Sequence, residues 1–260
     1  MTWLLLAVLF IGGSVVYAIV GTLVARRFMR RHVAESHNDV LAPIFLTAGV
    51  IYAVLLGFMV IAAWQSYDTA RSNTAEEASL LAPLYRQTLE MAPPQGGAMR
   101  GLIRDYATQV TKGWTAFRNS GEGDAQARMT IDSMLKVFHT VTPANKVGDI
   151  TAAQFSQTLS QVLLDRDTRM IHASESMSWI MWVAAVGGGL ITVGMSFVLY
   201  MEREVPHVVM TSVLAALIGI LLFIMAVLDH PFVGPVGITA EPFAASRKLF
   251  DLIDSDFQRP

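Results

Sequence analysis

Residues 44–64 read IFLTAGVIYAVLLGFMVIAAW and contain no Asp, Glu, Lys or Arg. A helix of about 20 apolar residues can cross the hydrocarbon core of a bilayer, which is about 30 Å thick. Three further stretches of this kind occupy residues 4–24, 179–200 and 208–228. Because buried helices of soluble proteins rarely repeat this length without a charge, the sequence predicts an all-α, polytopic membrane protein with four transmembrane helices.

The composition agrees with this fold class and limits the possible functions. Of the 260 residues, 53% are hydrophobic and 15% are charged, whereas soluble domains carry about 25% charged residues. The formal net charge is -2, so nothing indicates a nucleic-acid partner. The chain has no cysteine, which excludes disulfides, thiolate chemistry and metal sites with cysteine ligands.

The polar segment between the two pairs of apolar stretches indicates the domain organisation. Residues 65–90 contain no glycine, so the second transmembrane helix is predicted to continue beyond the membrane. Turn residues then separate further expected helices at 98–118, 125–140 and 151–176. The expected parts are transmembrane helices 1 and 2 with a basic loop (1–64), an extramembrane four-helix bundle between helices 2 and 3 (65–177), transmembrane helices 3 and 4 (178–228), and a tail with a short helix (229–260).

Basic residues in short loops predict the orientation of the chain. Arg26, Arg27, Arg30 and Arg31 follow the first apolar stretch, so the loop 25–41 is predicted to be cytoplasmic. The bundle and both termini then lie on the opposite side. For a bacterial source, this predicts a multi-pass protein of the inner membrane with periplasmic N- and C-termini. The same four arginines are candidates for contacts with anionic lipid headgroups.

Two blocks of sequence carry a resemblance to a known family. One is GVIYAVLLGF at residues 49–58, which continues through Trp64, Tyr67, Asn73 and Glu76-Glu77-Ala78, and the other is LDHPFVG at residues 228–234. With the helix pairing, they resemble the bacterial membrane family described as bestrophin-like domain over nearly the whole chain. The resemblance implies kinship with bestrophins, which are oligomeric anion channels with a central pore. Bestrophins carry a large cytoplasmic portion, whereas the charge bias here predicts an outer bundle, so anion selectivity is not carried over.

No motif indicates an enzyme. The chain has six histidines, and no two of them stand at the i, i+4 spacing of a helical metal site with a glutamate between them. It has neither a phosphate-binding glycine loop nor a Gly-x-Ser-x-Gly motif. We therefore expect no catalytic residue, no metal site and no cofactor. The charged residues at 165–169 are interpreted as surface or interdomain ion pairs, or as side chains that extend toward lipid headgroups, and not as a binding site.

One face of the second apolar stretch is the candidate pore lining. Helical steps back from the polar end of this stretch define the face, which consists of Val54, Gly57, Ile61, Trp64, Gln65 and Asp68. Gly57 and Ile61 would form an apolar throat below a ring of polar side chains. Apolar constrictions can gate by dewetting, and acidic rings favour cations. The alternative is that Asp68 forms an i, i+3 pair with Arg71 on a solvated helix face.

Three further carboxylates are candidates for a vestibule that attracts ions: Glu76, Glu77 and Asp229. Asp229 follows directly on the fourth apolar stretch, and carboxylates near the hydrocarbon edge often mark ion paths. The alternative for Asp229 is a helix-end cap before Pro231. For Glu76 and Glu77, the alternative is that they brace the bundle.

Together these features favour a homo-oligomeric ion channel of the bacterial inner membrane. A single subunit has too few helices to enclose a wide pore, so a tetramer or pentamer is expected, with the lipid bilayer and permeating inorganic ions as partners. The alternative is a non-conducting sensor or scaffold that binds a periplasmic partner through the bundle. A proton-driven, stator-like motor is a weaker hypothesis because it needs a carboxylate within the membrane, and the four apolar stretches contain none.

Overall fold

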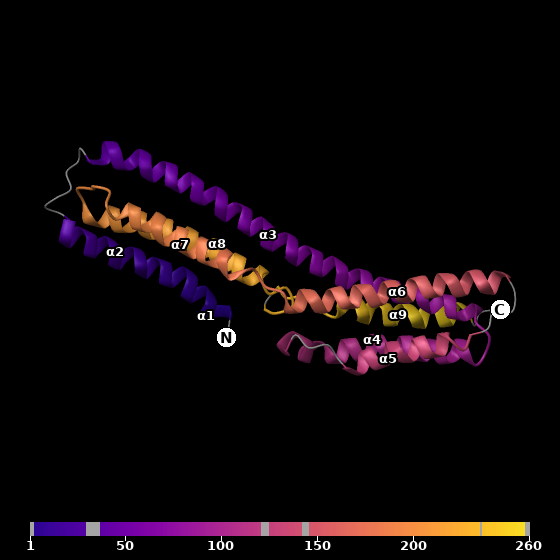
Figure 1. The fold of residues 1–260 in the computed structure, drawn as a ribbon. Helices are drawn as coiled ribbons and strands as arrows, with labels where there is room; N and C mark the ends of the chain where they lie inside the picture. Colours follow the sequence, from indigo (N-terminus) through magenta and orange to yellow (C-terminus); the bar gives the residue numbers. More distant parts are fainter. Residues whose placement is uncertain (1–2, 30–36, 121–124, 142–145, 235, 258–260) are drawn as a thin grey trace. The chain divides into compact units, whose positions relative to one another are not determined.

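The computed structural model contains helices and no strand in the residues that it describes, which are 3–29, 37–120, 125–141, 146–234 and 236–257. The helices are α1 (Trp3–Ala7), the π-helical turn η1 (Val8–Gly12), α2 (Gly13–Met29), α3 (Asn38–Gln87), the 3-10 turn η3 (Thr88–Glu90), α4 (Gln95–Ser120), α5 (Ala125–Phe138), α6 (Lys146–Ser174), α7 (Trp179–Ser196), α8 (Glu204–Leu228) and α9 (Glu241–Phe257) (Figure 1). The predicted all-α fold is confirmed.

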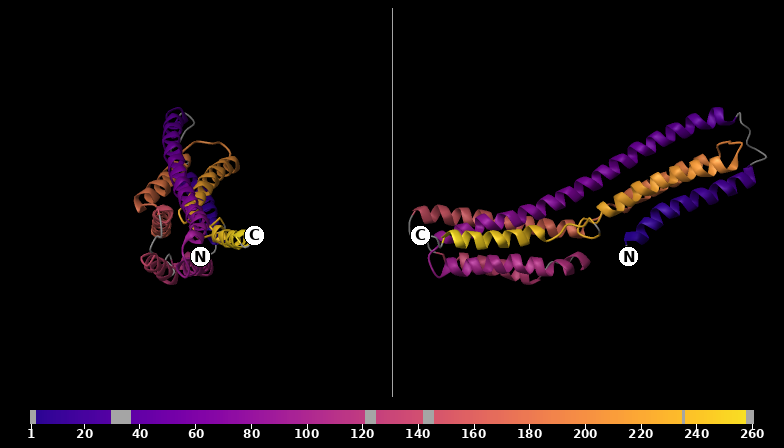
Figure 2. Two further views of the ribbon diagram at one scale, coloured as in Figure 1. Left: turned by 90° about the vertical axis from the view of Figure 1, so that its right-hand side faces the viewer. Right: turned by 180° about the vertical axis from the view of Figure 1, so that it is seen from behind.

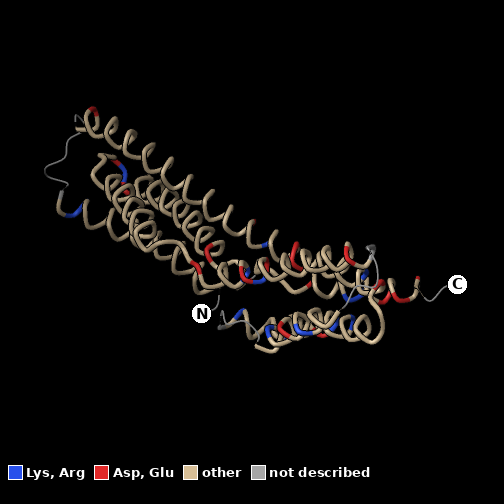
Figure 3. The backbone as a smooth tube through the Cα atoms, turned by 45° about the vertical axis from the view of Figure 1, so that its right-hand side comes forward, with Lys and Arg blue, Asp and Glu red and all other residues tan. Residues whose placement is uncertain are grey.

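Four of the helical segments are long and apolar enough to cross a membrane. They are Trp3–Phe28, Asn38–Glu90, Trp179–Ser196 and Glu204–Leu228. Charged residues are sparse along the apolar parts of these segments and frequent in the other helices (Figure 3). The prediction of four transmembrane helices, with a helical bundle between the second and the third, is confirmed.

The chain divides into two compact units, which we call the membrane unit and the bundle unit. The membrane unit comprises residues 1–67 and 176–230, and the bundle unit comprises residues 68–175 and 231–260. Helix α3 contributes residues to both units. It continues past Pro83 to Gln87, as the absence of glycine in this region predicted.

Close backbone approaches hold the helices of the membrane unit together. A Cβ atom added at Gly219 of α8 would lie 2.6 Å from the Phe10 carbonyl oxygen, so only glycine fits there. On another side of the unit, the ring of Tyr52 from α3 packs over Gly188 of α7, and its hydroxyl donates to the Ala185 carbonyl at 2.8 Å. Small residues therefore permit tight packing where lipid supplies no hydrophobic drive.

The bundle unit is built from the end of α3 together with α4, α5, α6 and α9. Helices α4 and α5 lie side by side in all ribbon views (Figure 2). Helix α9 packs against α4, and the Ser246 hydroxyl of α9 donates to the Ala78 carbonyl of α3 at 2.7 Å. Phe243 and Phe250 of α9 are fully buried. The helix of the C-terminal tail thus adds a fifth segment to the four expected from residues 65–177.

Candidate functional site

Helix α3 has a buried and an exposed face inside the membrane unit. Its buried face consists of Tyr52, Leu56, Met59 and Ala63, and none of them is more than 6% exposed. The candidate pore residues, which are all exposed, are Val54, Gly57, Ile61, Trp64, Gln65 and Asp68. At about 100° per residue, the centres of the two stripes lie about 150° apart around the helix. Within the membrane unit, which includes this face from Val54 to Gln65, the other described helices therefore leave the candidate pore face uncovered.

The exposed face of α3 is wider than the candidate stripe. Val50, Ile51, Leu55 and Phe58 are also exposed, by 40–68%, so exposure alone does not single out the stripe. The distinguishing feature of the candidate stripe is that its side chains change along the helix from apolar to polar, ending in Gln65 and Asp68. Within the described ranges, no ion pair joins Asp68 to Arg71.

Glu77 lies in the core of the bundle unit. Its side chain is 0% exposed, and it accepts hydrogen bonds from Arg169 Nε at 2.6 Å and Nη2 at 3.1 Å. The Tyr106 hydroxyl donates to the same carboxylate at 2.6 Å, and burial raises the pKa of Tyr106 well above its usual value. Glu77 thus braces the bundle through a buried ion pair, whereas its neighbour Glu76 is exposed.

Aromatic rings surround the cationic partner of this ion pair. The guanidinium carbon of Arg169 lies 5.5 Å from the ring centre of Trp114, 5.0 Å from that of Phe117 and 5.6 Å from that of Phe243. Such contacts stabilise a desolvated cation through the negative faces of the rings. The interpretation of residues 165–169 as surface or interdomain ion pairs is wrong for Arg169, which is 4% exposed and bonded within one unit.

Asp165 is a buried carboxylate with incomplete hydrogen bonding. It is 5% exposed. Its Oδ1 accepts from Gln161 Nε2 at 2.9 Å, whereas its Oδ2 has no hydrogen-bond partner in the part of the chain that the structure describes. Burial raises the pKa of Asp165, and repulsion from Glu76 and Glu77 raises it further. The charged form of Asp165 therefore destabilises the folded protein.

We expect Asp165→Asn to raise the thermal stability at pH 7 and not below pH 3. The unfolded state of the wild type ionises first as the pH rises, so stability falls between the ordinary pKa of about 3.9 and the raised folded-state value. A gain of about 1 kcal/mol would raise the melting temperature by about 2–4 °C. Thermal unfolding in detergent against pH checks this, with Asp132→Asn, at an exposed position in α5, as the control. An equal gain at both pH values would contradict it.

Asp229 fastens two helices of the membrane unit to each other. It stands at the C-terminal end of α8, and its Oδ1 accepts from the Met177 amide at 2.6 Å. Its Oδ2 accepts from the indole Nε1 of Trp182 at 3.2 Å. Asp229 therefore accepts from Met177, two residues before α7, and from Trp182 in the first turn of α7, and so links this segment to the end of α8.

The four arginines expected at lipid headgroups fall into three groups. Arg26 donates to the carbonyls of three consecutive residues, Met201, Glu202 and Arg203, at 2.9–3.3 Å. Arg27 is exposed. Arg30 and Arg31 lie outside the described residues. Arg26 thus satisfies backbone carbonyls in the segment before α8, a role that its position in a basic loop did not reveal.

The chain is similar to a known family and to several solved structures. The sequence model of the family described as Bestrophin-like domain matches residues 12–243. A bacterial bestrophin homologue from Klebsiella pneumoniae, solved by Zn-SAD phasing, has 12% sequence identity and a TM-score of 0.72 over 95% of this chain and 98% of that chain. A mutant of a bestrophin homologue from the same organism has 12% identity and a TM-score of 0.72 over 94% of this chain and 98% of that chain. A mutant described only as a membrane protein has 10% identity and a TM-score of 0.73 over 95% of this chain and 98% of that chain. Among curated proteins, no sequence matches.

Proposed function

The chain belongs to the Bestrophin-like domain family, and on this premise we propose that it forms a homo-oligomeric ion channel whose pore is lined by α3. The observation that carries this proposal is the uncovered face of α3, which lies opposite the face that packs inside the subunit. A lining helix needs this arrangement, because one of its faces must hold the subunit together while the other meets the pore.

The residue types along this face suit an ion path. In a tetramer or pentamer with the α3 helices around a common axis, Gly57 and Ile61 would form the narrow apolar part. Gln65 and Asp68 would supply a polar mouth, and Glu76 would add negative charge above it. Apolar constrictions gate by dewetting, and acidic rings attract cations.

The test is the current carried by purified protein in planar lipid bilayers. We expect discrete conductance steps that are absent from a mock purification made from cells without the gene. Oligomers of intact fold that carry no current would contradict the channel. They would favour a non-conducting sensor or scaffold that binds a partner through the bundle unit.

We further propose that the protein lies in the bacterial inner membrane with its bundle unit and both termini in the periplasm. This orientation rests on the basic residues that follow α2. Arg27 is exposed and free to contact anionic headgroups, whose attraction is worth about 1 kcal/mol per basic residue near the surface. The absence of cysteine makes the orientation easy to test with single engineered thiols.

We expect Ala153→Cys to react with a membrane-impermeant maleimide in intact cells, and Asp39→Cys to react only after lysis. Both positions are exposed, the first in α6 and the second at the start of α3. Mass-shift gels of the labelled protein measure the reaction. Protection of the α6 thiol together with labelling of the α3 thiol in intact cells would reverse the proposed orientation and leave the channel proposal unaffected.

A further inference from the structure

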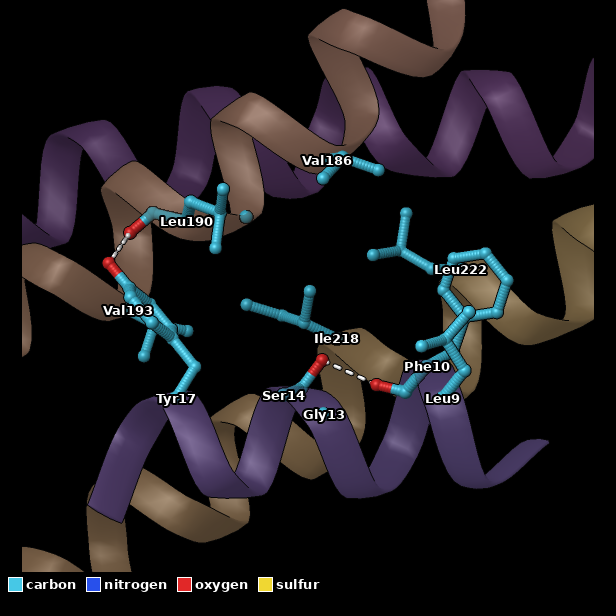
Figure 4. A pocket seen from close by; sticks show the side chains of 11 residues that line it. Leu9, Phe10, Gly13, Ser14, Tyr17, Val186, Leu190, Val193, Ile218 and Leu222 are labelled. Carbon is cyan, nitrogen blue, oxygen red and sulfur yellow. Dashed lines mark hydrogen bonds between the residues drawn. The ribbon is translucent and has the colours of Figure 1, made fainter. Parts of the chain in front are cut away.

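A groove of about 230 Å³ lies between α2 and α7 of the membrane unit, and α8 forms its floor (Figure 4). Its two hydroxyl groups are already engaged. Tyr17 donates to the Leu190 carbonyl at 3.1 Å, and Ser14 donates to the Phe10 carbonyl at 2.6 Å. The remaining lining is mostly aliphatic. The groove therefore offers a ligand apolar contact and no unpaired hydroxyl.

The position of the groove along the helices places it inside the hydrocarbon layer. The α7 residues of the groove run from Val186 to Val193. With a rise of 1.5 Å per residue, they lie about 10–20 Å along the helix from Trp179, the first residue of α7. On α8, Leu222 lies six residues before the last residue of the helix, which is about 9 Å. One leaflet contributes about 15 Å of hydrocarbon. The groove thus begins within reach of acyl chains from the leaflet at the Trp179 end.

We infer that this groove binds one acyl chain of a membrane phospholipid from the leaflet at the Trp179 end of α7. Water would find too few hydrogen-bond partners, because a buried water needs two to four. An empty groove would forfeit dispersion contacts along its lining. The α7 side of the groove, from Val186 to Val193, is about 10 Å long at 1.5 Å per residue, and an α-helix with its side chains is about 10–12 Å wide, so a helix of a second copy would cover the groove rather than enter it.

The π-helical turn η1 borders the groove. Its residue Phe10 lines the groove and stacks on Trp182 of α7, with ring centres 6.0 Å apart and an interplanar angle of 29°. π-helical turns are rare and are frequent at functional sites. Together, the turn and the stack hold the Phe10 ring in place beside the aliphatic part of the groove.

The first experiment counts bound lipid by native mass spectrometry. Protein from vesicles of phosphatidylethanolamine and phosphatidylglycerol is extracted into mild detergent, and the phospholipids retained per subunit are compared between variants. Gly13 lines the groove, and a Cβ atom added there meets no atom of the described residues within 4 Å, so the backbone at this position leaves room for the first side-chain atom of Gly13→Phe, whose ring is designed to occupy the groove. We expect this variant to retain one phospholipid fewer per subunit than the wild type.

Two further variants serve as controls for this comparison. Val16 lies on α2, is 58% exposed and does not line the groove, so Val16→Phe is expected to retain the wild-type number. Gly13→Ala removes the flexible glycine and leaves most of the space, so it also is expected to retain that number. Equal retention by all variants, including Gly13→Phe, would overturn the inference.

A second experiment distinguishes a lipid chain from a second copy of the protein. Leu190 lines the groove and is 46% exposed, and the chain has no native cysteine. We expect Leu190→Cys to give no disulfide-linked dimer under mild oxidation in vesicles. Linked dimers would show that another subunit covers the groove and would overturn the inference. Neither experiment measures ion conduction, so a failure of this inference would leave the channel proposal untouched, and the converse also holds.

Discussion

Arg169→Met is expected to lower the free energy of unfolding by about 3–5 kcal/mol, because it leaves the Glu77 carboxylate charged, buried and without its cation. The side chains of the pair are 5% and 0% exposed, so solvent cannot replace the lost partner. The substitution also removes the contacts of the guanidinium with three aromatic rings. For a chain of this size, such a loss lowers the melting temperature by about 6–20 °C. Thermal unfolding of the purified protein in detergent measures it.

A double variant and a surface variant make this test specific. Glu77→Leu combined with Arg169→Met removes both charges, and we expect it to recover most of the lost stability, as replacement of buried pairs by apolar residues often does. Asp251→Asn breaks an ion pair with Arg104 in which the carboxylate is 72% exposed, and its expected effect is about 0–1 kcal/mol. A double variant as unstable as Arg169→Met alone would show that packing, and not the stranded charge, causes the loss.

Ile61→Thr is expected to raise the single-channel current or the open probability about tenfold. A hydroxyl group in an apolar constriction stabilises water there and so lowers the barrier to wetting. A tenfold change corresponds to about 1.4 kcal/mol of barrier. Threonine keeps the β-branched shape of isoleucine, so helix packing is little disturbed. Recordings of purified protein in planar bilayers at fixed salt and voltage measure the change.

Leu55→Thr is the matched control for the pore prediction. Leu55 is also exposed on α3, by 40%, and it lies about 120° around the helix from Ile61. We expect the Leu55→Thr variant to carry the same current as the wild type. Similar increases in current for both variants would indicate a general loosening of the membrane unit. An unchanged current for Ile61→Thr would contradict the proposal that this residue forms the constriction.

The four transmembrane helices were predictable because length and hydrophobicity alone decide whether a segment can span lipid. Residues 44–64 needed no tertiary contact to identify them. The breaks between α4, α5 and α6 were predictable for a similar reason, because glycine and proline act locally. The packing of α9 into the bundle unit was not predicted, because a short amphipathic helix does not reveal which surface it covers.

The partners of individual charges could not be found from local patterns. Glu77 and Arg169 are 92 residues apart, and only the packing of α6 against α3 brings them together. Glu76 and Glu77 are neighbours in sequence, yet one is exposed and the other is buried, because successive helical residues point about 100° apart. A sequence pattern can assign a residue to a face, but the tertiary fold decides what that face meets.

The carbonyl contacts of Arg26 have a practical consequence for charge-reversal studies of insertion. Removing this guanidinium would remove a basic residue that sets the orientation, and it would also remove three hydrogen bonds that hold the segment between α7 and α8. A misfolded product could then be mistaken for an inverted one. Arg27, which is exposed, is the position where a glutamate scan would report on the insertion machinery alone.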